Sequence, residues 1–504
     1  MVAAAHWAAT AAGVEILEAG GNAVDAAVAA GFALGVAEPS GSGLGGMAHL
    51  VVHLEASGRT LAVLGPCRAP RREPGTKPAA TDNLVGYSTI AIPTQPGVLG
   101  YVLERYGTMP LQEVLLPAIA LARDGCVVSP FQHQLAANVL DSLQQGTAGA
   151  FFLDEHGRPP EPGFALRQLV LARTLERLAR VGVGDFFHGE IARSIVRDMR
   201  RNGGLVDQAD LQSVATPLET APLAGETFHG TAYALPPPGG GATLLQQLLL
   251  FERLAPPTFV PDSPAGAALF AAIARRAEID RRARPAPPVE RGTSAPPAVL
   301  AGDDLDRNAN LIRRELDAGS ETSHLSVMDR FGNAVALTQS INHAYGARCA
   351  APDLGFAYNC YLGDLNTTDP AHPYYLRPGA AARSNATPTI VVRNGQPTIA
   401  IGAAGERRML SVLLQVLVRL RDHSPYAAVA APRMFCSQSG TASLEAARWD
   451  AAVVEHLRRQ GLKINRWDDW AFKAGAVQLA VAGGDGFEGA ADPRRDGAAG
   501  GPDR

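Results

Sequence analysis

The sequence predicts an α+β fold in which helices lie outside stacked, mainly antiparallel sheets. Three observations lead to this class. Alanine and leucine recur at helical spacing through much of the first three hundred residues, and later β-branched runs alternate at period two around short turns. The composition, with 46% hydrophobic and 19% charged residues in a chain of 504, is that of a globular protein with a large core.

The first expected elements are two packed helices within residues 10–38, separated by the glycines of Gly20-Gly21-Asn22. The glycine-rich segment 40–47 that follows needs tight or left-handed backbone. It leads into HLVVHL and TLAVLG, whose β-branched residues indicate two antiparallel strands. Helix and sheet are therefore expected to pack together from the start of the chain.

Amphipathic helices are expected at 111–123 and 168–181, and a further helix at 244–254 after the proline- and glycine-rich turn 236–241. Between 256 and 307 the composition shifts to Pro, Ala, Asp and Arg with little periodicity. This shift predicts an exposed stretch and the best candidate for a boundary in the chain.

After that stretch, Leu325, Val327, Val335 and Leu337 recur at period two around the turn 329–333, which predicts two antiparallel strands. Two more strands are expected at 389–393 and 398–402, on either side of Asn394-Gly395. A helix at 410–420 should follow.

The charge and cysteine patterns exclude several classes of protein. The net charge is −4 and the basic residues are scattered, so no nucleic-acid partner is expected. Glu15 and Glu18 interrupt the apolar N-terminal run, which predicts no signal peptide, no membrane span and a cytoplasmic location. Five widely spaced cysteines predict free thiols, and neither His324 nor His343 has a second ligand at metal-binding spacing. We expect no metal or cofactor.

Hydroxyl side chains are crowded around residue 322 in Gly-Ser-Glu-Thr-Ser-His-Leu-Ser, just before the first of the later strands. A threonine at a strand start is ordinarily a cap or a β-former, so the crowding alone does not indicate catalysis.

Seven blocks of the chain change the interpretation of this threonine, because they occur in the order and at the spacing of a known family. They are GGNAVDAAVAAGFALGVAEPSGSGLGG from Gly20, YGTMPLQEVLLPAIALARDG from Tyr106, PPPGGGATLLQ from Pro236, TSHLSVMDRFGNAVALTQSIN from Thr322, TPTIVV from Thr387, AAPRM from Ala430 and the C-terminal ADPRRDGAAGG. Through them the chain resembles the γ-glutamyltransferase family over most of its length.

The resemblance implies an N-terminal-nucleophile hydrolase with a four-layer αββα fold. It implies a precursor that cuts itself between Glu321 and Thr322, leaving a mostly helical large subunit, 1–321, and a small subunit, 322–504, intertwined as one body. The partners expected are these two subunits and a small amide or γ-glutamyl substrate, with no membrane partner. A homo-oligomer is left open.

The implied chemistry centres on Thr322, whose hydroxyl attacks an amide carbonyl while its own α-amine acts as general base. Ser340 falls where the family carries a hydroxyl that touches the nucleophile. Gly405, in Gly402-Ala403-Ala404-Gly405, falls in the turn whose backbone N–H groups form the oxyanion hole.

The resemblance also implies substrate-binding residues. Asn342 falls on an Asn that holds the substrate carboxylate or the nucleophile, and Asp364 on the acidic residue that binds the α-amino group of a glutamyl substrate.

Several recognition positions depart from the family pattern. Tyr361 stands in place of a Gln, Ser384-Asn385 in place of a Ser-Ser pair, and Glu406 in place of the second glycine of the oxyanion turn.

The arginine that usually forks onto the substrate carboxylate is also missing. Pro66 stands at its position, so Arg68 or Arg71 substitutes only if the loop runs differently.

Three hypotheses follow. The first is a γ-glutamyltransferase-like amidohydrolase with glutathione and other γ-glutamyl compounds as substrates, resolved by water or an acceptor amine. The second is an acylase for a non-glutamyl amide, of the glutaryl or oxamate type, suggested by the altered recognition residues. The third is an uncleaved, inactive binding or scaffold relative, suggested by Glu406.

Overall fold

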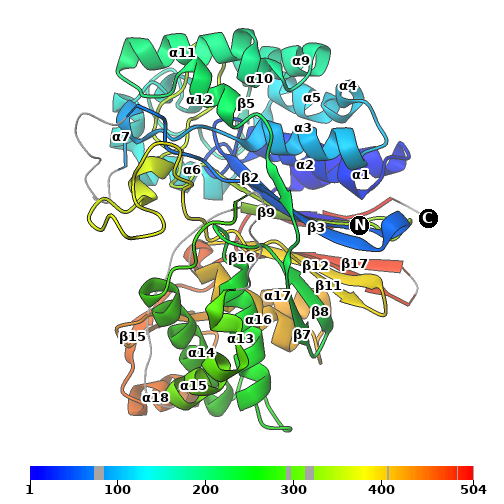
Figure 1. Ribbon diagram of the computed structural model, residues 1–504, viewed down its shortest axis with the longest axis vertical. Helices are drawn as coiled ribbons and strands as arrows, with labels where there is room; N and C mark the ends of the chain where they lie inside the picture. The colour runs from blue at the N-terminus through cyan, green and yellow to red at the C-terminus, as the bar shows by residue number, and fades with distance from the viewer. Residues whose placement is uncertain (73–83, 291–296, 313–322, 406–407, 485, 503–504) are drawn as a thin grey trace.

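Two antiparallel sheets are stacked face to face between two layers of helices (Figure 1). The structure, a computed structural model, describes residues 1–72, 84–290, 297–312, 323–405, 408–484 and 486–502. The α+β class and the four-layer αββα arrangement expected from the sequence are confirmed.

The first sheet interleaves strands from both sides of residue 322. In the described part of the chain its order is β18 (Ala498–Gly500), β1 (Val2–Ala4), β9 (Ser323–Met328), β10 (Ala334–Ser340), β2 (Met47–Leu54), β3 (Arg59–Gly65) and β6 (Leu218–Thr220). Strand β9 therefore lies between an N-terminal strand and β10, with its side chains buried along its whole length. The strands expected at HLVVHL, at TLAVLG and on both sides of the turn 329–333 are confirmed.

The second sheet is assembled in the same mixed way. Its order among the described residues is β17 (Gly486–Ala491), β16 (Ala476–Gly483), β12 (Gln396–Ala404), β11 (Thr389–Arg393), β8 (Gly230–Ala234) and β7 (Leu223–Thr227). Strands β12 and β16 of this sheet pack on β9 of the first. The strand pair expected around Asn394-Gly395 is confirmed.

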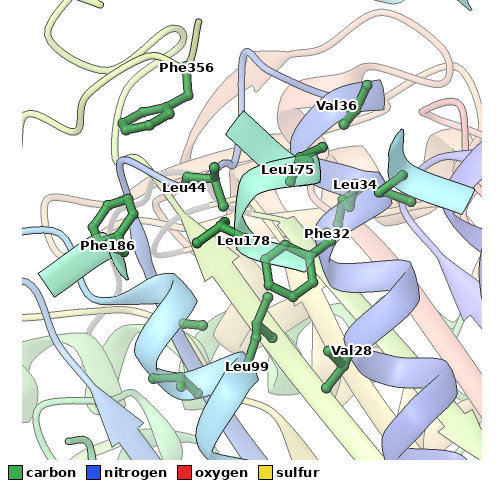
Figure 2. Close-up of a cluster of buried hydrophobic side chains, with 14 of the residues drawn as sticks. Val28, Phe32, Leu34, Val36, Leu44, Leu99, Leu175, Leu178, Phe186 and Phe356 are labelled. Atoms are coloured by element: carbon green, nitrogen blue, oxygen red, sulfur yellow. The ribbon is translucent and has the colours of Figure 1, made fainter. Parts of the chain in front are cut away.

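The helices outside the first sheet are α1 (Trp7–Glu18), α2 (Ala23–Ala37), α3 (Gln95–Tyr106), α4 (Leu111–Val114), α5 (Leu116–Asp124), α9 (Leu169–Val181), α10 (Asp185–His188), α11 (Glu190–Asn202) and α12 (Gln208–Ser213). Helix α2 is apolar on nearly every side because it is covered by the sheet and by other helices. Figure 2 shows Val28 and Phe32 of α2 gathered with Leu99 of α3 and Leu175 of α9 in this core.

The layer outside the second sheet contains α13 (Gly241–Leu254), α14 (Pro264–Ala283), α15 (Gly302–Ile312), α16 (Arg408–Arg419), α17 (Pro425–Ala430) and α18 (Ala451–Arg459), with a small sheet of β13 (Met434–Cys436), β14 (Thr441–Leu444) and β15 (Lys463–Arg466). Shorter elements complete the fold on the side of the first layer: α6 (Pro130–Asn138), α7 (Leu140–Gln145), α8 (Gly149–Phe152), and the strand pair β4 (Cys126–Val127) and β5 (Ala165–Leu166).

The exposed stretch and boundary expected at 256–307 were wrong. Helices α14 and α15 form there, and Ala267, Phe270, Ala274 and Ala277 are buried along α14 at helical spacing. Apart from Phe270, these side chains are small and stand among arginines and prolines, so the helical period was weak in the sequence. The helix expected at 111–123 is also divided, into α4 and α5, because Pro117 lies at the start of α5.

A hydrogen bond anchors the far end of β9 to the first helical layer. The Ala23 N–H at the start of α2 donates to Asp329 Oδ2 at 2.7 Å, immediately after β9 ends. A capping box formed by Asn22 and Asp25 fixes the start of the same helix. Strand β9 is thus held by a sheet neighbour on each side and by α2 at its C-terminal end.

Candidate active site

The predicted nucleophile and cleavage residues, Thr322 and Glu321, lie outside the described residues, as does Glu406. The first described residue of β9 is Ser323, which is fully buried and donates its hydroxyl proton to Glu38 Oε2 at 2.9 Å. Ser323 also pairs across the sheet with Gln339. The end of β10, where Ser340 lies, is therefore beside the start of β9.

Ser340 and Asn342 form one compact unit after β10. The Asn342 N–H donates to Ser340 Oγ at 2.9 Å, and the Asn342 side-chain amide donates to the Cys360 carbonyl at 3.4 Å. Asn342 has a φ of 81°, a left-handed conformation that is uncommon for a residue other than glycine and often marks a functional turn.

Tyr361 and Asp364 stand at the two ends of a short 3-10 turn, Tyr361–Asp364. Tyr361 is buried between the sheets, and burial raises the pKa of its phenol, although a hydrogen bond with Ser340 acts in the opposite direction. A side-chain hydrogen bond from Asn342 likewise acts to lower the pKa of Asp364. The structure therefore brings Ser340, Asn342, Tyr361 and Asp364 together.

Asp364 faces a cavity of about 380 Å³, the Asp364 cavity, lined by Glu278, Arg281, Arg282, Asp364, His372, Arg383, Ser384 and Asn385. The carboxyl is surrounded by protein although it is open to the cavity. Burial raises its pKa to about 6, while Asn342 and the charge of Arg383 act in the opposite direction. It is consequently mostly ionised at neutral pH and ready to receive a cation.

Arg281 holds the Ser384-Asn385 pair in the wall of this cavity. Its guanidinium donates to the Ser384 carbonyl at 2.8 Å and to Asn385 Oδ1 at 2.6 Å. The hydroxyl of Ser384 accepts from the Ala386 N–H at 3.0 Å, which fixes that side chain as well. Ser384 and Asn385 thus share one cavity with Asp364.

Gly405 comes directly after β12, where the second sheet meets the start of β9. Its φ is +122°, and a Cβ at this position would lie 2.6 Å from the Gly475 Cα. Three residues earlier, a Cβ on Gly402 would lie 2.3 Å from the His324 ring. Only glycine allows the backbone to come this close to its neighbours at these positions.

Arg68 does not line the Asp364 cavity, although its backbone pairs with Ala381, two residues before Arg383. It donates to the Gly379 carbonyl at 3.0 Å and lines a separate cavity of about 520 Å³ with Glu290. The exposed side chain of Arg71 lies 4.0 Å from Asp210. The structure thus brings neither arginine to the Asp364 cavity.

Sequence reasoning missed three charged residues near the site: Arg281, Arg383 and Glu38. Arg281 lies on α14, the helix that was not expected, and it meets Arg383 across a separation of 102 residues. Glu38 lines a second cavity of about 220 Å³ with Ser323 and Asn342. The polar contact of Glu38 with β9 is not visible in any local pattern of the sequence.

Three observations concern other features of the chain. Within the described ranges, no group of three or more His, Cys, Asp or Glu side chains is arranged to hold a metal ion. No helix in that part of the chain is long and apolar enough to cross a membrane. All five cysteines are buried free thiols, as the sequence predicted.

The layered fold belongs to the N-terminal-nucleophile class of hydrolases. The solved structure of a cephalosporin acylase from Bacillus halodurans superimposes with a TM-score of 0.90 at 25% identity, covering 100% of this chain and 96% of the other. The similarity extends over both sheets and both helical layers.

The chain belongs to the gamma-glutamyltranspeptidase family, whose model matches residues 9–501. A glutathione hydrolase proenzyme of Escherichia coli (strain K12) is 30% identical over 98% of this chain and 90% of the relative. An acylase ACY 1 proenzyme of Pseudomonas sp. (strain SE83) is 33% identical over 92% of this chain and 87% of the relative. The chain is therefore an enzyme of this family, an amidohydrolase.

Proposed function

We propose that this chain is a precursor that cuts itself between Glu321 and Thr322, and that the new N-terminal Thr322 is the nucleophile of an amide hydrolase or acyltransferase. The observation that carries the proposal is the convergence of Ser340, Asn342 and Asp364 beside the start of β9. Ser323, which follows Thr322 directly in the sequence, is the first described residue of that strand.

In the first chemical step, the Thr322 α-amine takes the proton of the Thr322 hydroxyl as Oγ attacks the amide carbonyl. The carbonyl oxygen becomes an oxyanion, for which the backbone N–H groups of the turn ending at Gly405 are the proposed donors. The C–N bond then breaks, the departing nitrogen takes the proton from the α-amine, and an ester joins the acyl group to Oγ.

In the second step, water or an acceptor amine attacks this ester and returns a proton to Oγ. Ser340 supports both steps as a hydroxyl partner for the nucleophile. Its own Oγ is held by the Asn342 N–H, so its orientation is set before substrate arrives.

The proposed default substrates are γ-glutamyl compounds such as glutathione. An ionised carboxyl in a protein-lined cavity suits the α-ammonium of a glutamyl group, and Asp364 is such a carboxyl. The relative from Escherichia coli is named for glutathione hydrolysis, which agrees with this substrate class.

An acylase for a non-glutamyl amide is the second candidate, favoured by a specific observation. Asn385, which replaces a hydroxyl residue of the family pattern, is held by Arg281 in the wall of the Asp364 cavity. The relatives named as acylases support a different acyl group on the same reaction. A glutaryl or oxamate amide would be its substrate.

The proposed subunits, 1–321 and 322–504, would remain together after cleavage. Both sheets contain strands from both sides of residue 322, so separation of the subunits would require both sheets to come apart. A cytoplasmic location is also proposed, since buried free thiols suit a reducing compartment.

Intact-mass measurement of the purified protein tests the proposal. Wild type should give two masses that correspond to 1–321 and 322–504, Thr322→Ala should remain one chain, and Thr322→Ser should still be cut because it retains a hydroxyl. Cleavage of Thr322→Ala at the same bond would contradict the proposal. A folded wild-type chain that stays whole and turns over no amide would instead favour the uncleaved scaffold hypothesis.

A further inference from the structure

Three guanidinium groups line the Asp364 cavity, and two of them are committed to local structure. Arg281 is largely buried and binds Ser384 and Asn385 through the hydrogen bonds described above. Arg282 forms an ion pair with Glu278, with 2.9 Å between Nε and Oε1. These two arginines shape the wall of the cavity.

Arg383 is held in a different way. One of its N–H groups donates to the Arg281 carbonyl at 2.7 Å, and its guanidinium carbon lies 5.9 Å from the centre of the Tyr374 ring. Tyr374 is itself buried and donates its hydroxyl proton to the Ala286 carbonyl at 2.9 Å. The Tyr374 ring face and the Arg281 carbonyl therefore position the Arg383 guanidinium at the cavity.

Arg383 is also the cation that acts on Asp364. Its charge favours the ionised form of that carboxyl and so acts against the effect of burial on the pKa of Asp364. Arg383 and Asp364 thus place a positive and a negative group in the same cavity. This is the arrangement that binds a molecule carrying both charges, or a carboxylate alone when the acid is protonated.

We propose that Arg383 is a specificity-determining residue that binds a carboxylate at the far end of the acyl group, so that preferred acyl donors end in a carboxylate. It supplies the cation that Arg68, in its separate cavity, does not supply. Asp364 adds a preference for an α-ammonium group on the same donor. The proposal rests on the proposed function, because it concerns the acyl half of that reaction.

A guanidinium suits this role because its planar fork of N–H donors matches the two oxygens of a carboxylate. The choice between a γ-glutamyl and a glutaryl group then depends on Asp364, and the need for a carboxylate depends on Arg383. Acyl groups without a carboxylate would lose the contact with Arg383 whether or not they carry an amine.

Four anilides separate these contributions. They share a four-carbon acyl chain and differ in the substituents on its last carbon: γ-glutamyl anilide has an amine and a carboxylate, glutaryl anilide only the carboxylate, 4-aminobutyryl anilide only the amine, and butyryl anilide neither. We would measure kcat/KM for all four with wild type, Arg383→Met and a control, Arg377→Met. Arg377 is exposed on the same segment and does not line the cavity.

Arg383→Met should lower kcat/KM by about 10- to 100-fold for the γ-glutamyl and glutaryl anilides, the range expected for loss of a charge-assisted hydrogen bond. The same variant should change the other two substrates less than about threefold, and Arg377→Met should match wild type on all four. An equal loss on all four, or no loss on any, would overturn the assignment of Arg383.

Failure of the proposed function gives a different result. In that case wild type is neither cut before Thr322 nor active on any of the four anilides. If Arg383→Met alone stays uncut, Arg383→Lys supplies the test, because it keeps the charge but not the fork. A loss confined to the two carboxylate-bearing substrates then supports the proposal, and a uniform loss overturns it.

Discussion

The two sides of the candidate site differ in structure: strand ends form one, and side chains around a cavity form the other. On one side, Ser340 and Gly405 stand at the ends of β10 and β12, where sheet pairing and close backbone contact determine their positions. On the other, the Asp364 cavity collects side chains from a 3-10 turn, an irregular segment and α14. On the first side, backbone geometry leaves little freedom for substitution. On the second side, replacement of a single side chain changes the lining of the cavity. The contrast explains how one family can keep a reaction while its acyl groups vary.

The largest effect should come from adding a single Cβ atom on the side of the site formed by the strand ends. Gly405→Ala places a Cβ 2.6 Å from the Gly475 Cα, too close for two carbon atoms that are not bonded, and the φ of +122° is strained for alanine. The displaced turn can no longer direct its N–H groups at the oxyanion, so kcat should fall by about 100-fold or more. Steady-state kinetics on any accepted anilide measures this loss.

Gly395→Ala is the matched control for that prediction. Gly395 also has a positive φ, +83°, in the turn between β11 and β12, but a Cβ there would meet nothing within 4 Å. Its substitution should lower stability by about 1 kcal/mol and leave kcat unchanged. Equal losses of kcat in the two variants would mean that strain in β12, rather than close approach at Gly405, explains the effect.

The next largest effect should come from Asp364, and it should depend on pH. Its pKa is raised to about 6, so it is protonated below that pH and ionised above it. Only the ionised form attracts an ammonium group, so kcat/KM for γ-glutamyl anilide should rise with pH through about 6. Glutaryl anilide should show the opposite trend, because protonation of Asp364 removes repulsion from its carboxylate.

Two variants assign that transition to its residue. Asp364→Asn should remove it and lower kcat/KM for γ-glutamyl anilide by about 10- to 100-fold at pH 7.5. The cavity also contains Glu278, Arg281, Arg282, Arg383 and His372, and the pKa of His372 is lowered by burial and by Arg383. His372→Gln should therefore keep the transition, and its loss in this variant would assign the titration to His372 instead.

The contrast between the two sides also explains what the sequence could reveal. The alternation of Leu325, Val327, Val335 and Leu337 was sufficient to predict β9 and β10, and pairing of these strands places Ser340 beside the start of β9. Sheet register is a local, repeating signal, so it can be read from a short window.

The Asp364 cavity carries no such signal. Family resemblance pointed to Asp364, Ser384 and Asn385, but Arg281 belongs to a helix whose small buried residues concealed its period. Its contact with Arg383 joins segments 102 residues apart, and only the completed packing of the second helical layer brings them together. Arg68 is the opposite case. The sequence suggested it as a carboxylate-binding cation, but in the fold it lines another cavity.

A smaller effect is expected from Arg281, which acts on the cavity through Ser384 and Asn385. Arg281→Met would leave the Ser384 carbonyl and Asn385 Oδ1 without their donor, so stability should fall by about 1–3 kcal/mol and KM should rise roughly tenfold. Arg282→Met is the stability control, because its ion pair with Glu278 is partly exposed and should contribute at most about 1 kcal/mol. Denaturant unfolding and KM measure both effects. Equal destabilisation in the two variants would contradict the distinct role given to Arg281.

The smallest effect tests whether only the first residue of β9, or the whole strand, influences the rate of self-cleavage. Ser323→Ala removes the donor to Glu38, and Ser326→Ala removes the donor to the Gln478 carbonyl on the same strand, with both serines fully buried. Each should lower stability by about 1 kcal/mol. Only Ser323→Ala should slow self-cleavage, by roughly two- to fivefold, because Ser323 follows the proposed scissile bond by one residue in the sequence. The cleavage time course is followed by intact mass after synthesis in vitro. If Ser326→Ala slows cleavage equally, the whole strand, rather than its first residues, sets the rate.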